Sequence, residues 1–138
     1  MPDKILESVK IISSSNNYNL WIYKKIRKYL YGNILDVGSG IGNIAKYLVA
    51  DKRVGNVILI DKSEEMFIRL KDTFGYFKNC GVKKLDICEI SDHQLRSLGP
   101  VDTVTCLNTL EHLDDITALN NIYNINFTSV ALFLVTVL

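Results

Sequence analysis

Ile34-Leu35-Asp36-Val37-Gly38-Ser39-Gly40-Ile41-Gly42 is the stretch of sequence that decides the fold of this chain. A short apolar run ends around the carboxylate of Asp36, and three glycines then follow at alternate positions. The apolar run predicts a buried strand. Glycines permit positive φ angles and let the backbone approach a bound molecule closely. The stretch therefore predicts a strand that delivers the chain into a ligand-binding turn.

The spacing of the glycines separates two classes of nucleotide-type ligand. The dinucleotide fingerprint is G-x-G-x-x-G, in which the third glycine serves helix packing. Here Asn43 stands at that position, and the third glycine comes one residue earlier, at Gly42. An acidic residue, Asp36, also precedes the loop directly. The pattern disfavours a nicotinamide-dependent oxidoreductase, which we keep as a minor alternative.

Strands and helices are predicted to alternate on both sides of this loop. We divide the chain into an N-terminal helical segment, residues 1–31, and a core, residues 32–138. The predicted strands of the core are 33–37, 56–60, 81–85, 101–107 and 130–137, and the predicted helices are 43–50, one opening at Ser63, 91–98 and 115–125. This alternation predicts an α/β fold with a mostly parallel, doubly wound sheet. Ligands of such sheets bind outside the carboxyl ends of the strands.

Acidic residues stand at the carboxyl ends of the second and third predicted strands. Asp61 ends the second, and its two oxygens can accept both hydroxyl hydrogens of a ribose. Lys62 follows it and is either a solvated residue or part of the same site. Asp86 could accept from an adenine amino group while Ile87 packs on the ring. The alternative for Asp86 is an ordinary exposed acid of a loop.

The segment after the fourth predicted strand carries the polar residues Asn108, Glu111 and His112. Asn108 is expected to face the reactive end of the ligand. His112 is the candidate general base, because histidine alone has an unperturbed pKa near neutrality. Its alternative is a structural role at a helix start. No metal site is predicted, since His93 lies far away on a different element.

Composition points to one soluble domain. The chain has 138 residues, is 48% hydrophobic and carries a formal net charge of +1. That charge predicts no strong global attraction to nucleic acid or to an anionic membrane. The longest apolar run, 130–138, is far shorter than the roughly 20 residues of a membrane-spanning helix. Three cysteines without a C-x-x-C pair are expected to be reduced thiols, which favours a cytoplasmic location.

With these residues in place, the chain resembles the class I S-adenosylmethionine (SAM)-dependent methyltransferases from about Tyr18 to Leu138. The resemblance is closest to members that act on small molecules and carry a Leu-Glu-His segment, here residues 110–112. It implies a Rossmann-like sheet ordered 3-2-1-4-5, SAM as cofactor and a small-molecule methyl acceptor. The residues that it implies for the cofactor are Asp36, Gly38, Ser39, Gly40, Gly42, Asp61, Lys62, Asp86, Ile87 and Asn108.

Three expectations follow from the resemblance and from departures from it. The family usually continues beyond the fifth strand, whereas this sequence stops at Leu138, so we expect the C-terminal strands to be missing. A SAM-binding truncated or regulatory domain without turnover is therefore the alternative function. We also expect a second copy or a partner to cover the edge of the fifth strand. Tyr18 and Trp21 either cover the cofactor or pack on the sheet.

Overall fold

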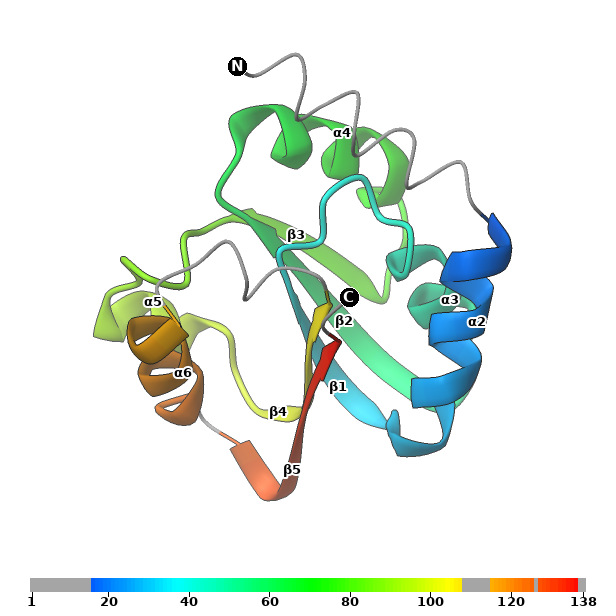
Figure 1. Ribbon diagram of the computed structural model, residues 1–138. Coiled ribbons are helices and arrows are strands. Elements are labelled where there is room, and N and C mark those ends of the chain that lie inside the picture. The colour runs from blue at the N-terminus through cyan, green and yellow to red at the C-terminus, as the bar shows by residue number, and fades with distance from the viewer. Residues whose placement is uncertain (1–15, 108–114, 126, 137–138) are drawn as a thin grey trace.

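The computed structural model describes residues 16–107, 115–125 and 127–136 of the chain (Figure 1). Helices and strands alternate along these residues, as the sequence predicts. The strands are β1 (Gly32–Val37), β2 (Val54–Asp61), β3 (Cys80–Lys84), β4 (Val101–Leu107) and β5 (Phe127–Thr136). The helices are α2 (Asn16–Ile26), the 3-10 helix η1 (Arg27–Tyr29), α3 (Ala45–Ala50), α4 (Glu64–Phe74), α5 (Asp92–Ser97) and α6 (Asp115–Tyr123).

The five strands form one sheet in the order β3-β2-β1-β4-β5, and every neighbouring pair is parallel. This confirms the predicted α/β fold and the predicted strand order. The register of the central strands sets Asp36 of β1 beside Leu59 of β2 and Thr105 of β4. The carboxyl ends of β1 and β2 therefore meet at the same edge of the sheet, where such folds bind ligands.

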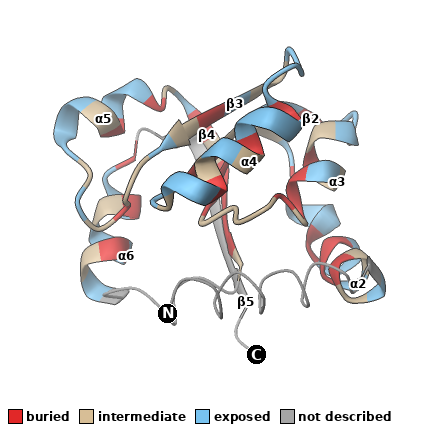
Figure 2. Cartoon of the chain, turned by 90° about the horizontal axis from the view of Figure 1, so that it is seen from above, coloured by how far each residue is buried: buried red, intermediate tan, exposed pale blue. Residues whose placement is uncertain are grey.

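Helices cover both faces of the sheet, and each face has its own hydrophobic core. Strand residues alternate between the faces: Val57 and Leu59 of β2 belong to one core, and Ile60 belongs to the other. The first core packs against α2, α3 and α4, and the second packs against α5 and α6. Figure 2 shows buried residues on the helix sides that face the sheet. Burial on both faces explains why the strands read as continuous apolar runs.

Two helix starts follow directly from local sequence. Ser63 caps α4, because its side-chain oxygen accepts from the backbone N–H of Met66 at 3.3 Å. Ser91 and Gln94 form a reciprocal capping box at the start of α5, with hydrogen bonds of 3.0 and 3.1 Å. Such caps satisfy backbone donors that have no partner within the helix. The sequence locates both of these starts correctly.

Several predicted boundaries differ from the structure. The helix after the glycine loop begins at Ala45 rather than at Asn43, because residues 41–44 form turns first. The third strand ends at Lys84 instead of extending to residue 85. The fifth strand begins at Phe127, before the predicted start at residue 130. A shift of register between Val101 and Thr103 in the pairing of β4 with β5 accompanies that earlier start.

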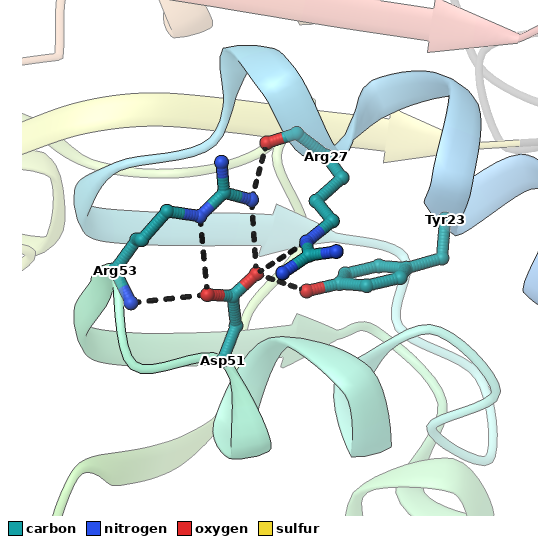
Figure 3. A network of polar contacts seen from close by, with 4 residues as sticks. All are labelled: Tyr23, Arg27, Asp51 and Arg53. Carbon is teal, nitrogen blue, oxygen red and sulfur yellow. Dashed lines mark hydrogen bonds and ion pairs between the residues drawn. The ribbon is translucent and has the colours of Figure 1, made fainter.

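A buried carboxylate fastens α2 to the loop that leads into β2 (Figure 3). The Tyr23 hydroxyl of α2 donates to Asp51, and both Arg53 and Arg27 form ion pairs with the same carboxylate, at 3.1 and 3.7 Å. The hydrogen bonds from Arg53 hold the pKa of Asp51 well below its usual range. Burial, together with the hydrogen bond to Asp51, raises the pKa of Tyr23 to about 12. The network ties the helix preceding β1 to the core.

Candidate functional site

The glycine loop leaves β1 at the carboxyl edge of the sheet and is held there by β2. The backbone N–H groups of Gly38 and Ser39 both donate to the carbonyl oxygen of Ile60, at 2.9 and 3.1 Å. The Ser39 hydroxyl donates to the carbonyl oxygen of Asp36 at 3.0 Å. These bonds fix the first half of the loop against the neighbouring strand, so its shape is set without a ligand.

The three glycines of the loop all have positive φ angles, of 69° at Gly38, 60° at Gly40 and 89° at Gly42. Their surroundings differ. A Cβ added to Gly40 would meet nothing within 4 Å, so this position opens onto free space. A Cβ added to Gly42 would lie 2.3 Å from the Phe74 ring of α4. Gly40 therefore borders the space that a ligand could fill, whereas Gly42 is required for packing against α4.

Asp61 at the end of β2 connects the loop to the start of α4. One carboxylate oxygen accepts from the backbone N–H of Gly40 at 2.9 Å, and the other accepts from Ser63 N–H at 2.9 Å. A carboxylate offers about four lone-pair positions, so two backbone bonds leave room for further donors. The arrangement fits the predicted role on a vicinal diol. It also gives Asp61 a structural role that the sequence analysis did not foresee.

Asp36 is almost completely buried, with 4% of its surface exposed. The Thr105 hydroxyl of β4 donates to its Oδ1 atom at 2.6 Å. Burial raises the pKa of Asp36 to about 6, the nearby Asp61 carboxylate adds to the rise, and the hydrogen bonds from Thr105 and Ser39 oppose it. A buried carboxylate of this kind is stabilised when a cation binds beside it.

At the carboxyl end of β3, the predicted site residues Asp86 and Ile87 form hydrogen bonds that involve backbone groups. Asp86 accepts from Cys88 N–H at 2.9 Å through Oδ1, which closes a local turn. Ile87 is only 2% exposed and packs in the second core, and its carbonyl oxygen accepts from Asn121 of α6 at 2.6 Å. The Ile87 side chain thus packs in the core, whereas the sequence suggested that it would pack on a ligand ring.

The remaining predicted residues are Lys62, the polar residues that follow β4, and two aromatic residues of α2. Lys62 is exposed beside Asp61. Asn108 and His112, like Glu111, lie outside the described residues. Of the two aromatic residues that the sequence left open, Tyr18 packs partly buried against the first core, and Trp21 is 56% exposed. Trp21 stacks on Tyr18 with a centroid separation of 6.3 Å.

The described part of the site concentrates negative charge. Asp36 and Asp61 bring two carboxylates to the glycine loop, and the charge of Asp61 contributes to the raised pKa of Asp36. A cationic ligand would be attracted there, whereas the pyrophosphate of a dinucleotide would be repelled. Within the described ranges, no group of three or more His, Cys, Asp or Glu side chains could hold a metal ion. The geometry therefore favours a positively charged ligand.

Thr105 is the residue of this site that sequence reasoning missed. It lies within the apolar run of β4, which the sequence identifies only as a buried strand, and it is fully buried. The available signal was a hydroxyl at alternate positions of this strand, Thr103 and Thr105, facing a neighbouring strand that contains a carboxylate. The pairing register, which sequence alone does not supply, aligns Thr105 with Asp36.

Comparisons with known proteins agree with this geometry. A sequence model of the family described as "Methyltransferase domain" matches residues 35–125. A search of curated protein sequences finds no significant match. Among the described helices, none has the length and apolar character needed to cross a membrane.

Solved structures share the fold at low sequence identity. A SAM-dependent methyltransferase from Aquifex aeolicus is 23% identical, has a TM-score of 0.68, and aligns with 88% of this chain and 67% of its own. A SAM-dependent methyltransferase from Clostridium acetobutylicum is 18% identical and has a TM-score of 0.65, and the alignment covers 85% of this chain and 48% of that protein. The N-terminal domain of EvdMO1, solved with S-adenosylhomocysteine (SAH) bound, is 17% identical, has a TM-score of 0.64, and aligns with 85% and 48%.

The matched region spans about half the length of the last two structures. It contains the glycine loop, the carboxylates of Asp36 and Asp61, and the strand order on which the site depends. Because the family model matches more than half of the sequence, the chain belongs to the family described as "Methyltransferase domain".

Proposed function

We propose that this chain binds SAM at the carboxyl edge of its sheet and transfers the methyl group to a small-molecule acceptor. The observation that carries the proposal is the pairing of an open glycine loop with two carboxylates. Asp61 is anchored to Gly40, and Asp36 is buried directly before the loop. SAM carries a sulfonium, an ammonium and a ribose, and all three suit acidic partners. SAH bound to the EvdMO1 domain supports the same ligand class.

Each described residue has a definite task in this proposal. Asp61 would accept from the ribose hydroxyls while keeping its bond to Gly40. The open space at Gly40 would admit the methionine portion next to the backbone. Asp36 would face the cationic end of the cofactor, and Thr105 would hold its carboxylate in place. We further propose, from the sequence, that Asn108 lines the transfer pocket and that Lys62 and Asp86 border the nucleoside.

When bound, SAM supplies an already activated methyl group, so the transfer is a direct displacement. The protein then contributes mainly orientation and exclusion of water, which can supply about 7–11 kcal/mol of the barrier. A general base is needed only if the acceptor must lose a proton. His112 is our candidate for that role with hydroxyl acceptors. The acceptor is proposed to be small because Asn108-Thr109-Leu110-Glu111 differs from the Asn-Pro-Pro-aromatic segments of nucleic-acid methyltransferases.

The test is SAH production by the purified chain in the presence of SAM and a panel of small acceptors with hydroxyl, amine, carboxylate and phenol groups. We expect SAH to form with at least one acceptor class. Asp61→Ala should abolish SAH formation, whereas Asp72→Ala, an exposed acid on α4, should leave it unchanged. SAH formation that persists in Asp61→Ala would contradict the proposed site.

A second candidate function is SAM binding without turnover. It is favoured by one observation, that the matched region covers only about half the length of the Clostridium and EvdMO1 structures. Under this alternative, SAH binds to the chain, yet no acceptor gives product. Calorimetric binding without SAH formation across the whole panel would select it over the first.

We also propose that the outer edge of β5 pairs with a second copy or a partner chain. β5 lies at the end of the strand order, and its sequence Phe127–Thr136 contains no charged residue or proline that would discourage pairing. Light scattering coupled to size exclusion should then give a mass above the 15.6 kDa of one chain. A stable, well-behaved monomer of the purified chain would count against this proposal.

A further inference from the structure

The outward face of α2 carries lysines and an aromatic ring together. Trp21, Lys24 and Lys25 of α2 follow the i, i+3, i+4 spacing that places side chains on one helix face, and Lys28 follows in the 3-10 helix η1. All four are exposed, and Trp21 is 56% exposed. We call this set the lysine–tryptophan stripe. The opposite face of α2 is buried in the first core, so the stripe lies on the solvent side of this helix and of η1.

Charge is strongly segregated along the chain, although the net charge is only +1. Residues 16–57 contain seven lysines and arginines and two aspartates. Of these aspartates, Asp36 is buried, and Asp51 is already engaged by two arginines. Residues 58–138 contain seven basic and eleven acidic residues. The segment formed by α2 and η1 is itself strongly basic, because residues 16–29 contain four lysines and arginines and no acidic residue.

The lysines of the stripe are not used within the fold. Among the described residues, none of the three forms an ion pair with a carboxylate. Instead, the Lys25 ammonium lies 5.7 Å from the Trp21 ring centroid, and the Lys28 ammonium lies 4.9 Å from the Tyr29 ring centroid. Tyr29 is itself 45% exposed. Cations and exposed rings thus alternate over a short surface.

We propose that the lysine–tryptophan stripe docks single-stranded nucleic acid. Lysines that contact phosphates, interleaved with aromatic rings on which bases stack, are the usual means of binding a single strand. An anionic bilayer fits the surface less well. Insertion requires a free apolar helix face, and the apolar residues of α2, Ile22, Tyr23 and Ile26, are buried in the core.

The position of α2 relates this surface to the cofactor site. α2 leads through η1 into β1, so its last turn lies near the amino edge of the sheet and its first turn lies toward the carboxyl edge (Figure 1). A single strand of nucleic acid docked along α2 would therefore run between the amino and carboxyl edges of the sheet, on the outside of the helix layer. This docking does not depend on the proposed methyl transfer, and it can be measured without SAM.

The test uses a fluorescein-labelled oligouridylate about 12 nucleotides long, a length within the range that single-strand sites cover. We expect saturable binding by anisotropy, with an affinity that falls as salt rises. Contacts from three lysines to phosphates give a slope of log K against log salt of about −2. Trp21 is the only tryptophan of the chain, so quenching of its emission by unlabelled oligouridylate reports stacking at this position.

Two matched variants decide the assignment. Lys24→Gln/Lys25→Gln/Lys28→Gln should weaken binding at least about tenfold at low salt and remove most of the salt dependence. The control is Lys71→Gln/Lys78→Gln/Arg96→Gln, which makes the same change in charge at exposed positions outside α2 and η1. This control should bind the oligouridylate as the parent does. Circular dichroism establishes that both variants are folded.

Three results would overturn the proposal. The first is the absence of salt-dependent binding to the oligouridylate. The second is an equal loss of affinity in the control triple variant, which would show attraction to charge in general. The third is co-sedimentation with phosphatidylcholine vesicles containing phosphatidylserine, without any binding of the oligouridylate, which would identify a membrane surface instead.

Discussion

Replacing Asp36 by asparagine should stabilise the folded protein while weakening its cofactor site. Asp36 is 4% exposed, and burial raises its pKa to about 6 from an ordinary value of 3.8. This rise in pKa corresponds to a destabilisation of the folded state by about 3 kcal/mol when Asp36 is charged, because a change of one in pKa corresponds to about 1.4 kcal/mol. Asparagine keeps an oxygen that can accept from Thr105, yet it carries no charge to desolvate. We therefore expect Asp36→Asn to raise the free energy of unfolding by up to about 3 kcal/mol at neutral pH.

The pH dependence of this gain follows from the direction of the shift. A carboxyl whose folded-state pKa is raised binds its proton more tightly in the folded state than in the unfolded chain. The parent therefore loses stability as pH rises from about 4 to about 6, and the loss is complete above about pH 7. The variant has no such titration at this position. The stability difference between the two proteins should be near zero at pH 4 and largest above pH 7.

Urea denaturation at several pH values measures this difference directly. Unfolding can be followed by circular dichroism, and the midpoint multiplied by the common slope gives the free energy of unfolding. Asp72→Asn, on the exposed side of α4, is the control and should change stability by less than about 0.5 kcal/mol. A destabilised Asp36→Asn protein at pH 7.5, or a stability difference that does not vary with pH, would show that burial of the Asp36 charge does not destabilise the fold.

Two glycine positions of the loop and the α2 network give further predictions. Gly42→Ala should cost about 2–5 kcal/mol by urea denaturation, because the added methyl meets a ring at a positive φ. Gly40→Ala should cost only about 1–2 kcal/mol and yet reduce SAH affinity in calorimetry, because its methyl would enter open space; equal stability losses would contradict this. Tyr23→Phe should cost about 1 kcal/mol by removing the hydrogen bond to Asp51, whereas Tyr76→Phe, 89% exposed, should cost nothing measurable.

The overall fold could be predicted from sequence because its signals are local. Alternating apolar runs and helix starts such as Ser63 and Ser91 fix element order, and parallel α/β sheets allow few topologies. The predicted boundaries of helices and strands were wrong where tertiary pairing overrides local preference. β5 begins at Phe127 because it pairs with β4, and α3 begins late because the glycine loop continues as turns to residue 44.

The candidate site was predictable only in part, for a related reason. Residue type and order placed Asp36, Gly40 and Asp61 at the carboxyl edge of the sheet. The contacts among them depend on register and on three-dimensional closeness, so the bond from Gly40 to Asp61 and the hydroxyl of Thr105 could not be inferred. The packing role of Gly42 likewise depends on where Phe74 of α4 comes to lie.

We propose above that the glycine loop with Asp36 and Asp61 forms a SAM site and not a dinucleotide site. Isothermal titration calorimetry of the purified chain with SAH and, separately, with NAD tests it most directly. We expect saturable heat with SAH, which is lost in Asp61→Ala, and no binding of NAD. Binding of NAD without any binding of SAH would contradict it.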